Sequence, residues 1–117
     1  MKRDNVIENK SKSFAVRVVK LCGYLQDSKK EFILTKQLLR SGTSIGANVK
    51  EALRGQSKAD FISKMNIALK EASETEYWLE ILHETEYLST NEYESIYSDN
   101  KELLKILMSI VKTSRKE

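Results

Sequence analysis

The chain has 117 residues, of which 40% are hydrophobic and 32% are charged, so it can form the core of one domain but hardly of two. The net charge of +3 is modest, and the single cysteine excludes a disulfide framework and favours the reducing cytoplasm. No apolar run approaches the roughly 20 residues of a membrane span, and the polar N-terminus lacks the apolar stretch of a secretory signal. Proline is absent and glycine is rare, which favours an all-α fold over a β-rich one. We expect one cytoplasmic, all-α domain over residues 1–117.

The first two amphipathic segments cover residues 12–26 and 30–54. Asp27 and Ser28 are expected to end the first helix and to cap the second. Gly55 stands where a helix-ending glycine is expected. Apolar residues recur at helical spacing in both segments: Phe14, Val18, Leu21, Cys22 and Leu25 in the first, and Leu34, Leu38, Ile45, Val49 and Ala52 in the second.

The third segment covers residues 58–88, and Ser57 with Asp60 forms a variant capping box at its start. The fourth covers residues 91–113, and Thr90 or Asn91 can cap it. Both carry apolar stripes at alternating spacings of four and three, as in coiled coils. The stripes are Phe61, Met65, Ala68, Ala72, Thr75, Leu79 and Leu82, and then Tyr93, Ile96, Asn100, Leu103, Leu107 and Ile110.

Short connections join the four segments, which predicts an antiparallel up-down four-helix bundle. The two ends of the chain, residues 1–10 and 114–117, are expected to fray, as chain ends commonly do.

Several residues on the predicted inner faces are unusual for a core. Ser41 and Asn48 lie at the edge of the second stripe and Asn100 lies on the fourth, so they either set the register between helices or form a polar pocket for a ligand. Gly42 and Gly46 lower helix propensity by about 1 kcal/mol each relative to alanine. A close crossing with another helix, of the same chain or of another chain, would offset that cost.

The charge is distributed unevenly along the chain. Residues 1–60 hold 13 Lys and Arg against 6 Asp and Glu, a charge of +7, whereas residues 61–117 hold 7 against 11, a charge of −4. On the second helix, cations cluster on the face opposite Ile45, and the first helix adds two more. The candidate nucleic-acid site is Arg17, Lys20, Lys36, Arg40, Lys50 and Arg54.

This basic surface would hold a polyanion by counterion release, without any preference for sequence. No aromatic residues are interleaved with it, which argues against stacking of single-stranded bases. The alternative is an ordinary solvated helix face.

A second apolar face is predicted on the third helix, away from its core stripe. Ile67, Trp78 and Ile81 share this face with Glu71 and Glu74, and an off-core tryptophan is typical of an interface anchor. The candidate contact between copies of the chain is Ile67, Glu74, Trp78 and Ile81. Alternatively, the third helix packs against two neighbours within one bundle.

Residues suited to catalysis are scarce. His83 is the only histidine and Cys22 the only cysteine, so no Cys/His metal set exists, and Glu80-x-x-His83 is a single copy of a motif that di-metal bundles need twice. No glycine-rich phosphate loop occurs. We expect a protein that is not an enzyme and that carries no metal or cofactor.

The second and third predicted helices carry a recognisable combination of motifs. The second contains Arg40-Ser41-Gly42-Thr43-Ser44-Ile45-Gly46-Ala47-Asn48-Val49-x-Glu51, and the third contains Asp60-Phe61, Ala68-Leu69-Lys70-Glu71-Ala72 and Glu74-Thr75-x-Tyr77-Trp78-Leu79. These segments resemble the bacterial four-helix-bundle family of 23S rRNA intervening-sequence proteins, over about residues 13–90. Ala52, where many relatives carry glycine, and the few basic residues in the C-terminal half depart from the family pattern.

The resemblance implies an up-down bundle that assembles into a homopentameric ring. It also implies a relation to the accessory protein of diversity-generating retroelements, a similar ring that binds nucleic acid and a reverse transcriptase. The leading prediction is therefore a non-enzymatic, oligomeric bundle that binds RNA or DNA through its basic face. The alternative is a protein-interaction scaffold, such as an accessory subunit of a reverse transcriptase, with no nucleic-acid role of its own.

Overall fold

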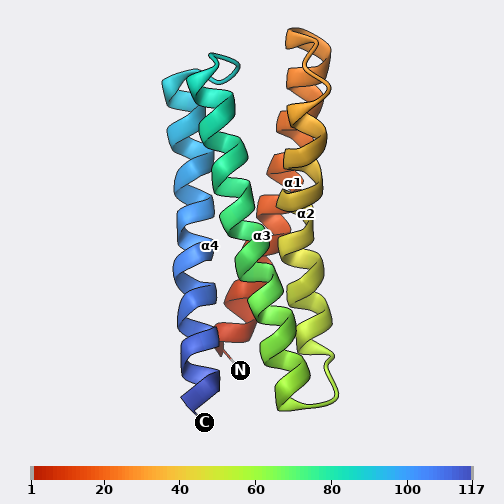
Figure 1. Cartoon of the computed structure of the whole chain (residues 1–117), viewed down its shortest axis with the longest axis vertical. Helices are drawn as coiled ribbons and strands as arrows, with labels where there is room; N and C mark the ends of the chain where they lie inside the picture. Colours follow the sequence, from red (N-terminus) through yellow and green to blue (C-terminus); the bar gives the residue numbers. More distant parts are fainter. Residues whose placement is uncertain (1, 117) are drawn as a thin grey trace.

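The computed structural model describes residues 2–116 as four helices without a strand, which confirms the predicted all-α bundle (Figure 1). The helices are α1 (Lys2–Lys29), α2 (Leu34–Leu53), α3 (Lys58–Glu84) and α4 (Thr90–Lys116). Successive helices run antiparallel and form an elongated molecule of 46 × 21 × 19 Å. None of the helices in residues 2–116 combines the length and the apolar character that a membrane span requires.

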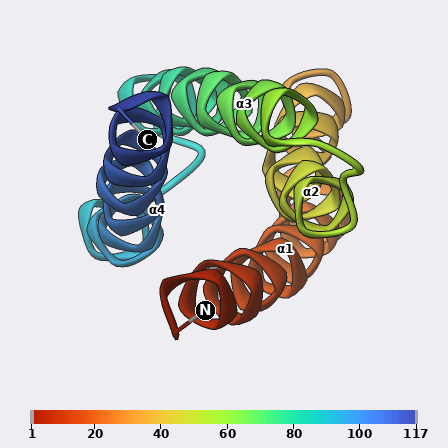
Figure 2. The same cartoon turned by 90° about the horizontal axis from the view of Figure 1, so that it is seen from below.

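The four helices follow one another around the long axis of the bundle (Figure 2). Each consecutive pair packs closely, whereas α1 and α4 meet over a much smaller contact. In the described part of the chain the diagonal pairs, α1 with α3 and α2 with α4, have no Cα atoms within 8 Å of each other. The bundle is therefore two helical hairpins joined mainly through α2 and α3, with a looser seam between α1 and α4.

The core is built from the predicted stripe of each helix. Leu21, Leu34, Phe61 and Tyr93 are half-buried, and the other residues of the four predicted stripes are buried. Cys22 is among the buried residues, and its thiol donates a hydrogen bond to the carbonyl of Thr35 at 3.4 Å. Burial, with a smaller contribution from the charge of Glu31, raises the pKa of this thiol to about 11.

The ends of α1 and α4 differ from the prediction. Residues 2–10 are helical, and Ile7, one heptad before Phe14, is fully buried. Residues 114–116 are also helical, and Ser114 is buried. The predicted fraying is therefore wrong for these residues, while Met1 and Glu117 lie outside the described residues. Apart from Val6 and Ile7 this stretch is polar, and among the described residues Ile7 is the only buried apolar side chain that continues the stripe toward the N-terminus.

The connection between α1 and α2 was also predicted wrongly. Asp27 and Ser28 lie inside α1, and the cap of α2 comes from Glu31 instead. The Glu31 carboxylate accepts hydrogen bonds from three backbone N–H groups, those of Ile33 at 3.3 Å, Leu34 at 3.1 Å and Thr35 at 2.8 Å. Burial alone would raise the pKa of Glu31, but these hydrogen bonds outweigh it and leave the pKa below its ordinary value.

The connection between α2 and α3 follows the prediction in part. Asp60 N–H donates to the Ser57 hydroxyl at 3.0 Å, which confirms the cap of α3. Gly55 follows the end of α2 as expected, but its φ is not positive. A Cβ at Gly55 would lie 3.1 Å from the backbone carbonyl oxygen of Ala52 and 2.7 Å from a carboxylate oxygen of Asp60, so a side chain here would be crowded although the backbone is not left-handed.

The connection between α3 and α4 begins earlier than predicted, because α3 ends at Glu84 rather than at residue 88. A reciprocal capping box then starts α4: Ser89 N–H donates to Glu92 at 2.8 Å, and Glu92 N–H donates to the Ser89 hydroxyl at 3.2 Å. The cap therefore lies one residue before the predicted Thr90.

The unusual core residues connect helices. The Thr75 hydroxyl donates to Ser41 at 2.9 Å, and the Asn100 amide donates to the Ala72 carbonyl at 3.0 Å. These contacts agree with the register-setting interpretation. Asn48 differs, because its amide donates to Ser44 of its own helix at 2.8 Å.

The two helical glycines of α2 face α1. A Cβ at Gly42 would lie 2.8 and 2.9 Å from the methyl groups of Val18, and a Cβ at Gly46 would lie 3.3 Å from the carbonyl oxygen of Ser11. The predicted close crossing therefore occurs within one chain.

Candidate binding surfaces

Three cations of the predicted basic stripe form the outer face of α2. Lys36, Lys50 and Arg54 are exposed, on the side of the helix opposite the fully buried Ile45. In the described part of the chain, none of the three forms an ion pair. They extend over about 27 Å along the helix at 1.5 Å per residue. We call these three residues the α2 stripe.

Arg40 lies on the same helix but is occupied. Its guanidinium forms ion pairs with Glu71, at 2.9 Å, and with Glu74, both on α3. The hydrogen bond to Glu74 is the main cause of a raised pKa of Arg40. Glu74 also accepts a hydrogen bond from the indole of Trp78 at 2.9 Å, which, followed by Arg40, lowers the pKa of the Glu74 carboxyl. Arg40 therefore ties α2 to α3 and offers a partner little free charge.

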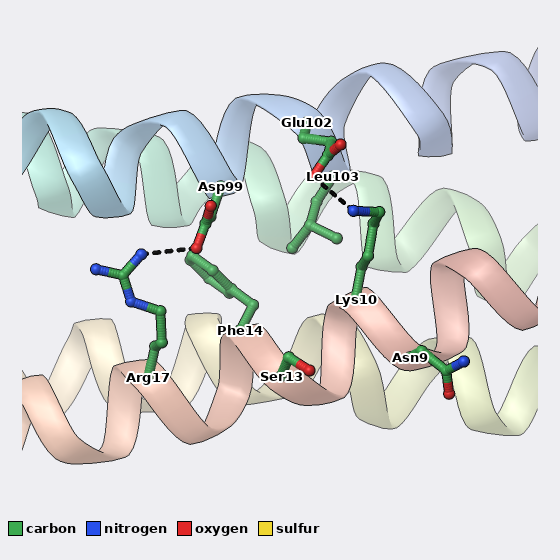
Figure 3. A pocket seen from close by; sticks show the side chains of 8 residues that line it. All are labelled: Asn9, Lys10, Ser13, Phe14, Arg17, Asp99, Glu102 and Leu103. Carbon is green, nitrogen blue, oxygen red and sulfur yellow. Dashed lines mark hydrogen bonds and ion pairs between the residues drawn. The ribbon is translucent and has the colours of Figure 1, made fainter.

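The two cations predicted on α1 lie apart from the α2 stripe, on the side of α1 that faces α4. Arg17 pairs with Asp99 at 2.6 Å across the α1–α4 seam, and Lys10 pairs with Glu102 at 3.1 Å beside it (Figure 3). These pairs border a hollow of about 280 Å³ that reaches Phe14. Lys20 lines the neighbouring hollow of this seam. The fold therefore does not gather the predicted cations into one surface.

The predicted contact face on α3 is only partly open. Ile67 is 38% exposed, whereas Trp78 and Ile81 are half-buried and Trp78 packs against the core. The ring of Tyr77, 53% exposed, meets Trp78 edge to face with centroids 5.0 Å apart. Trp78 therefore packs partly within its own bundle, as the alternative interpretation of this face expected. Tyr77, one helical turn before Ile81, lies at the edge of this face and was not among the predicted contact residues.

A row of aromatic rings along α3 and α4 also escaped the sequence analysis. His83 stacks on Tyr93 at 4.2 Å, and Tyr93 lies 4.8 Å from Tyr97. The Tyr97 hydroxyl donates to Glu76 at 2.9 Å, and burial, followed by this carboxylate, raises the pKa of Tyr97. Within residues 2–116, no group of three or more His, Cys, Asp or Glu side chains could hold a metal ion. The row holds two helices together.

The fold and these surfaces define an up-down four-helix bundle with charged and apolar outer faces. Residues 3–109 match the model of the 23S rRNA-intervening sequence protein family, and the chain belongs to that family.

A protein of unknown function from the S23 ribosomal protein family of Bacteroides thetaiotaomicron VPI-5482, with a crystal structure at 1.70 Å resolution, is 59% identical to the chain. The match covers 94% of this chain and 98% of that one, with a TM-score of 0.93. The comparison with curated proteins found no match.

Proposed function

We propose that this chain is a non-enzymatic, cytoplasmic bundle that binds RNA or DNA through the α2 stripe and works as a homo-oligomer. The observation that carries the proposal is the exposure of Lys36, Lys50 and Arg54 without carboxylate partners among the described residues. Membership of a family named for an rRNA intervening sequence supports a nucleic acid as the anionic partner. Arg17 and Arg40 contribute less, because both already pair with carboxylates. Lys20 adds charge at a separate edge.

The stripe acts through charge alone. Three cations that displace counterions give a logarithmic salt slope of about −2 for single strands and about −3 for duplex DNA for each copy of the stripe. No aromatic side chain belongs to the stripe, so binding is independent of base sequence. Assembly would place several stripes on one particle and steepen the slope.

A triple variant, Lys36→Gln with Lys50→Gln and Arg54→Gln, tests the proposal. We expect its affinity for labelled single-stranded and duplex oligonucleotides to fall at least about tenfold at low salt, with a shallower salt slope. Fluorescence anisotropy at several salt concentrations measures both. Arg40 is left unchanged, because its replacement would also remove the tie to Glu71 and Glu74.

The matched control removes three charges from α4, which lies diagonally across the bundle from α2. Lys105→Gln with Lys112→Gln and Lys116→Gln lowers the net charge equally, and we expect it to keep the affinity. Equal losses in both variants, or no loss in either, would contradict the α2 stripe as the binding surface.

The second candidate function is a protein-interaction scaffold, such as an accessory subunit of a polymerase. Tyr77, exposed beside Trp78, and Ile67, exposed further toward the start of α3, favour it because they offer apolar contact area. Pull-downs from lysate with and without nuclease separate the two functions. A partner that survives nuclease favours the scaffold, and one that is lost favours nucleic-acid binding.

A further inference from the structure

A groove between α3 and α4 lies near the C-terminal end of α4, where the two helix axes separate (Figure 1). It consists of two adjoining hollows of about 710 and 470 Å³ that share Leu69 and Met108. Leu104 and Val111 complete an aliphatic floor. Met108 is 57% exposed there, although such a side chain would be more stable buried. The groove is therefore apolar along its floor.

The rim of the groove is cationic. Every lysine and arginine after Phe61, except Lys64, lines it: Lys70, Lys101, Lys105, Lys112, Arg115 and Lys116. Lys101 pairs with Glu76 at 3.4 Å, and the other rim cations form no ion pair within the described residues. The net negative charge of residues 61–117 concealed this cationic cluster in the sequence, because the carboxylates of that half lie mainly toward the other end of the α3–α4 hairpin.

The floor and the rim lie on one stripe of α4. Lys101, Lys105, Met108, Lys112 and Arg115 follow spacings of four and three, so they share one side of the helix. At 1.5 Å per residue the stripe is about 21 Å long, which matches about four turns of a partner helix. An apolar centre flanked by cations is complementary to a helix whose apolar stripe is flanked by carboxylates.

We propose that this groove docks an acidic amphipathic α-helix of a partner protein. Leucine-like side chains of the partner cover Met108 and Leu69, and its Glu or Asp side chains reach the rim lysines. A flexible methionine adapts to such a surface. A nucleic acid would satisfy the rim but leave the aliphatic floor uncovered, and none of the residues that line the groove offers an aromatic ring for stacking.

The groove is independent of the α2 stripe. Its lining residues all belong to α3 and α4, and α4 lies diagonally across the bundle from α2. Loss of nucleic-acid binding in the α2 triple variant therefore leaves this proposal standing, and the reverse also holds.

The test uses the full chain and a fluorescein-labelled, lactam-bridged helical peptide of 18 residues with leucines at heptad spacing and glutamates beside them. We expect saturable binding in the micromolar range by anisotropy. A peptide with the same composition in scrambled order should bind at least about tenfold more weakly. Met108→Ser should weaken binding of the ordered peptide about tenfold, and Lys105→Gln with Lys112→Gln should weaken it and reduce its salt dependence.

Met108 is solvent-facing, so Met108→Ser is expected to fold normally, and circular dichroism checks this. Met108→Lys gives a second variant with the floor blocked. Equal binding of the ordered and scrambled peptides, or no effect of either Met108 variant, would overturn the proposal. It would also be overturned if a single-stranded oligonucleotide displaced the peptide and bound Met108→Ser as tightly as the unchanged chain, because the groove would then be a nucleic-acid surface.

Discussion

The helical glycines of this bundle have opposite environments. At Gly42 a side chain would collide with Val18, whereas at Gly23 an added Cβ would meet nothing within 4 Å. Alanine raises helix propensity at both sites by about 1 kcal/mol. Whether a Gly→Ala change raises or lowers the free energy of unfolding therefore depends on how closely the neighbouring helix packs at that position.

We expect Gly23→Ala to stabilise the chain by about 0.5–1 kcal/mol and Gly42→Ala to destabilise it by about 1–3 kcal/mol, because the two helices must separate. Urea denaturation followed by circular dichroism measures both. Adding Val18→Ala to Gly42→Ala should cost less than the sum of the single changes, since the smaller side chain makes room. Strict additivity would show that the crossing is not tight at Gly42.

Glu31 shows how a single carboxylate organises a loop. Its three hydrogen bonds to backbone N–H groups fix residues 33–35 at the start of α2, while the loop side chains Phe32 and Ile33 are exposed, at 57% and 77%. Because its pKa in the folded state lies below that in the unfolded state, its contribution to stability is complete above the unfolded-state pKa. The contribution is lost as the pH falls through the folded-state pKa.

Glu31→Gln should lower the free energy of unfolding at pH 7 by about 1–2 kcal/mol, because charge-assisted caps become neutral ones. The difference from the unchanged chain should shrink as the pH falls below about 4. Denaturation curves from pH 7 to pH 3 check this, with the exposed Glu94→Gln as control. A difference that stays constant with pH would contradict the role of the ionised carboxylate.

Among the elements, α1 owes its first turns to one side chain. Ile7 is fully buried while its apolar neighbour Val6 is 37% exposed, so Ile7 anchors a stretch whose other residues are polar. Helix propensity alone leaves short helical ends marginal in water. Packing of Ile7 therefore keeps residues 2–10 helical.

Ile7→Ala is expected to destabilise the bundle by about 2–4 kcal/mol through the cavity that it leaves. Hydrogen exchange should also rise in the first turns of α1. Val6→Ala, which also truncates a β-branched side chain but on the open side of the helix, should cost less than about 0.5 kcal/mol. Similar losses for both variants would show that burial does not distinguish these positions.

At the scale of the helices, some features could be predicted from the sequence and others could not. Period and spacing predicted the four helices, their stripes and the cap at Ser57, because these depend on local pattern. The cap at Glu31 escaped prediction because its carboxylate reaches forward from the loop rather than from a usual capping position. The ion-pair partners of Arg17 and Arg40 could not be predicted either, because Asp99 and Glu71 lie on other helices, far away in the sequence.

At the scale of the whole molecule, the proposed assembly into a homo-oligomer depends on the partly apolar outer face of α3. Ile67 and Tyr77 are its exposed apolar residues, while Trp78 is held by Glu74 and by the core. A change at Trp78 would therefore mix folding with assembly, and Ile67 gives the cleaner test.

Ile67→Asp should lower the particle mass toward that of one chain, measured by light scattering after size exclusion, with helicity unchanged. Val16→Asp places the same charge on α1 at a position of comparable exposure and should leave the mass unaltered. An unaltered mass for Ile67→Asp would remove this face from any contact between subunits.

The single thiol of the chain allows transient opening of the bundle to be measured. Cys22 is buried between α1 and α2, and its raised pKa keeps the thiol protonated at neutral pH. An alkylating reagent therefore modifies it only when local opening separates these helices. The ratio of its alkylation rate to that of a free cysteine reports the population of such excursions. A single reactive sulfur yields a single adduct, so mass spectrometry reads that population without any added label.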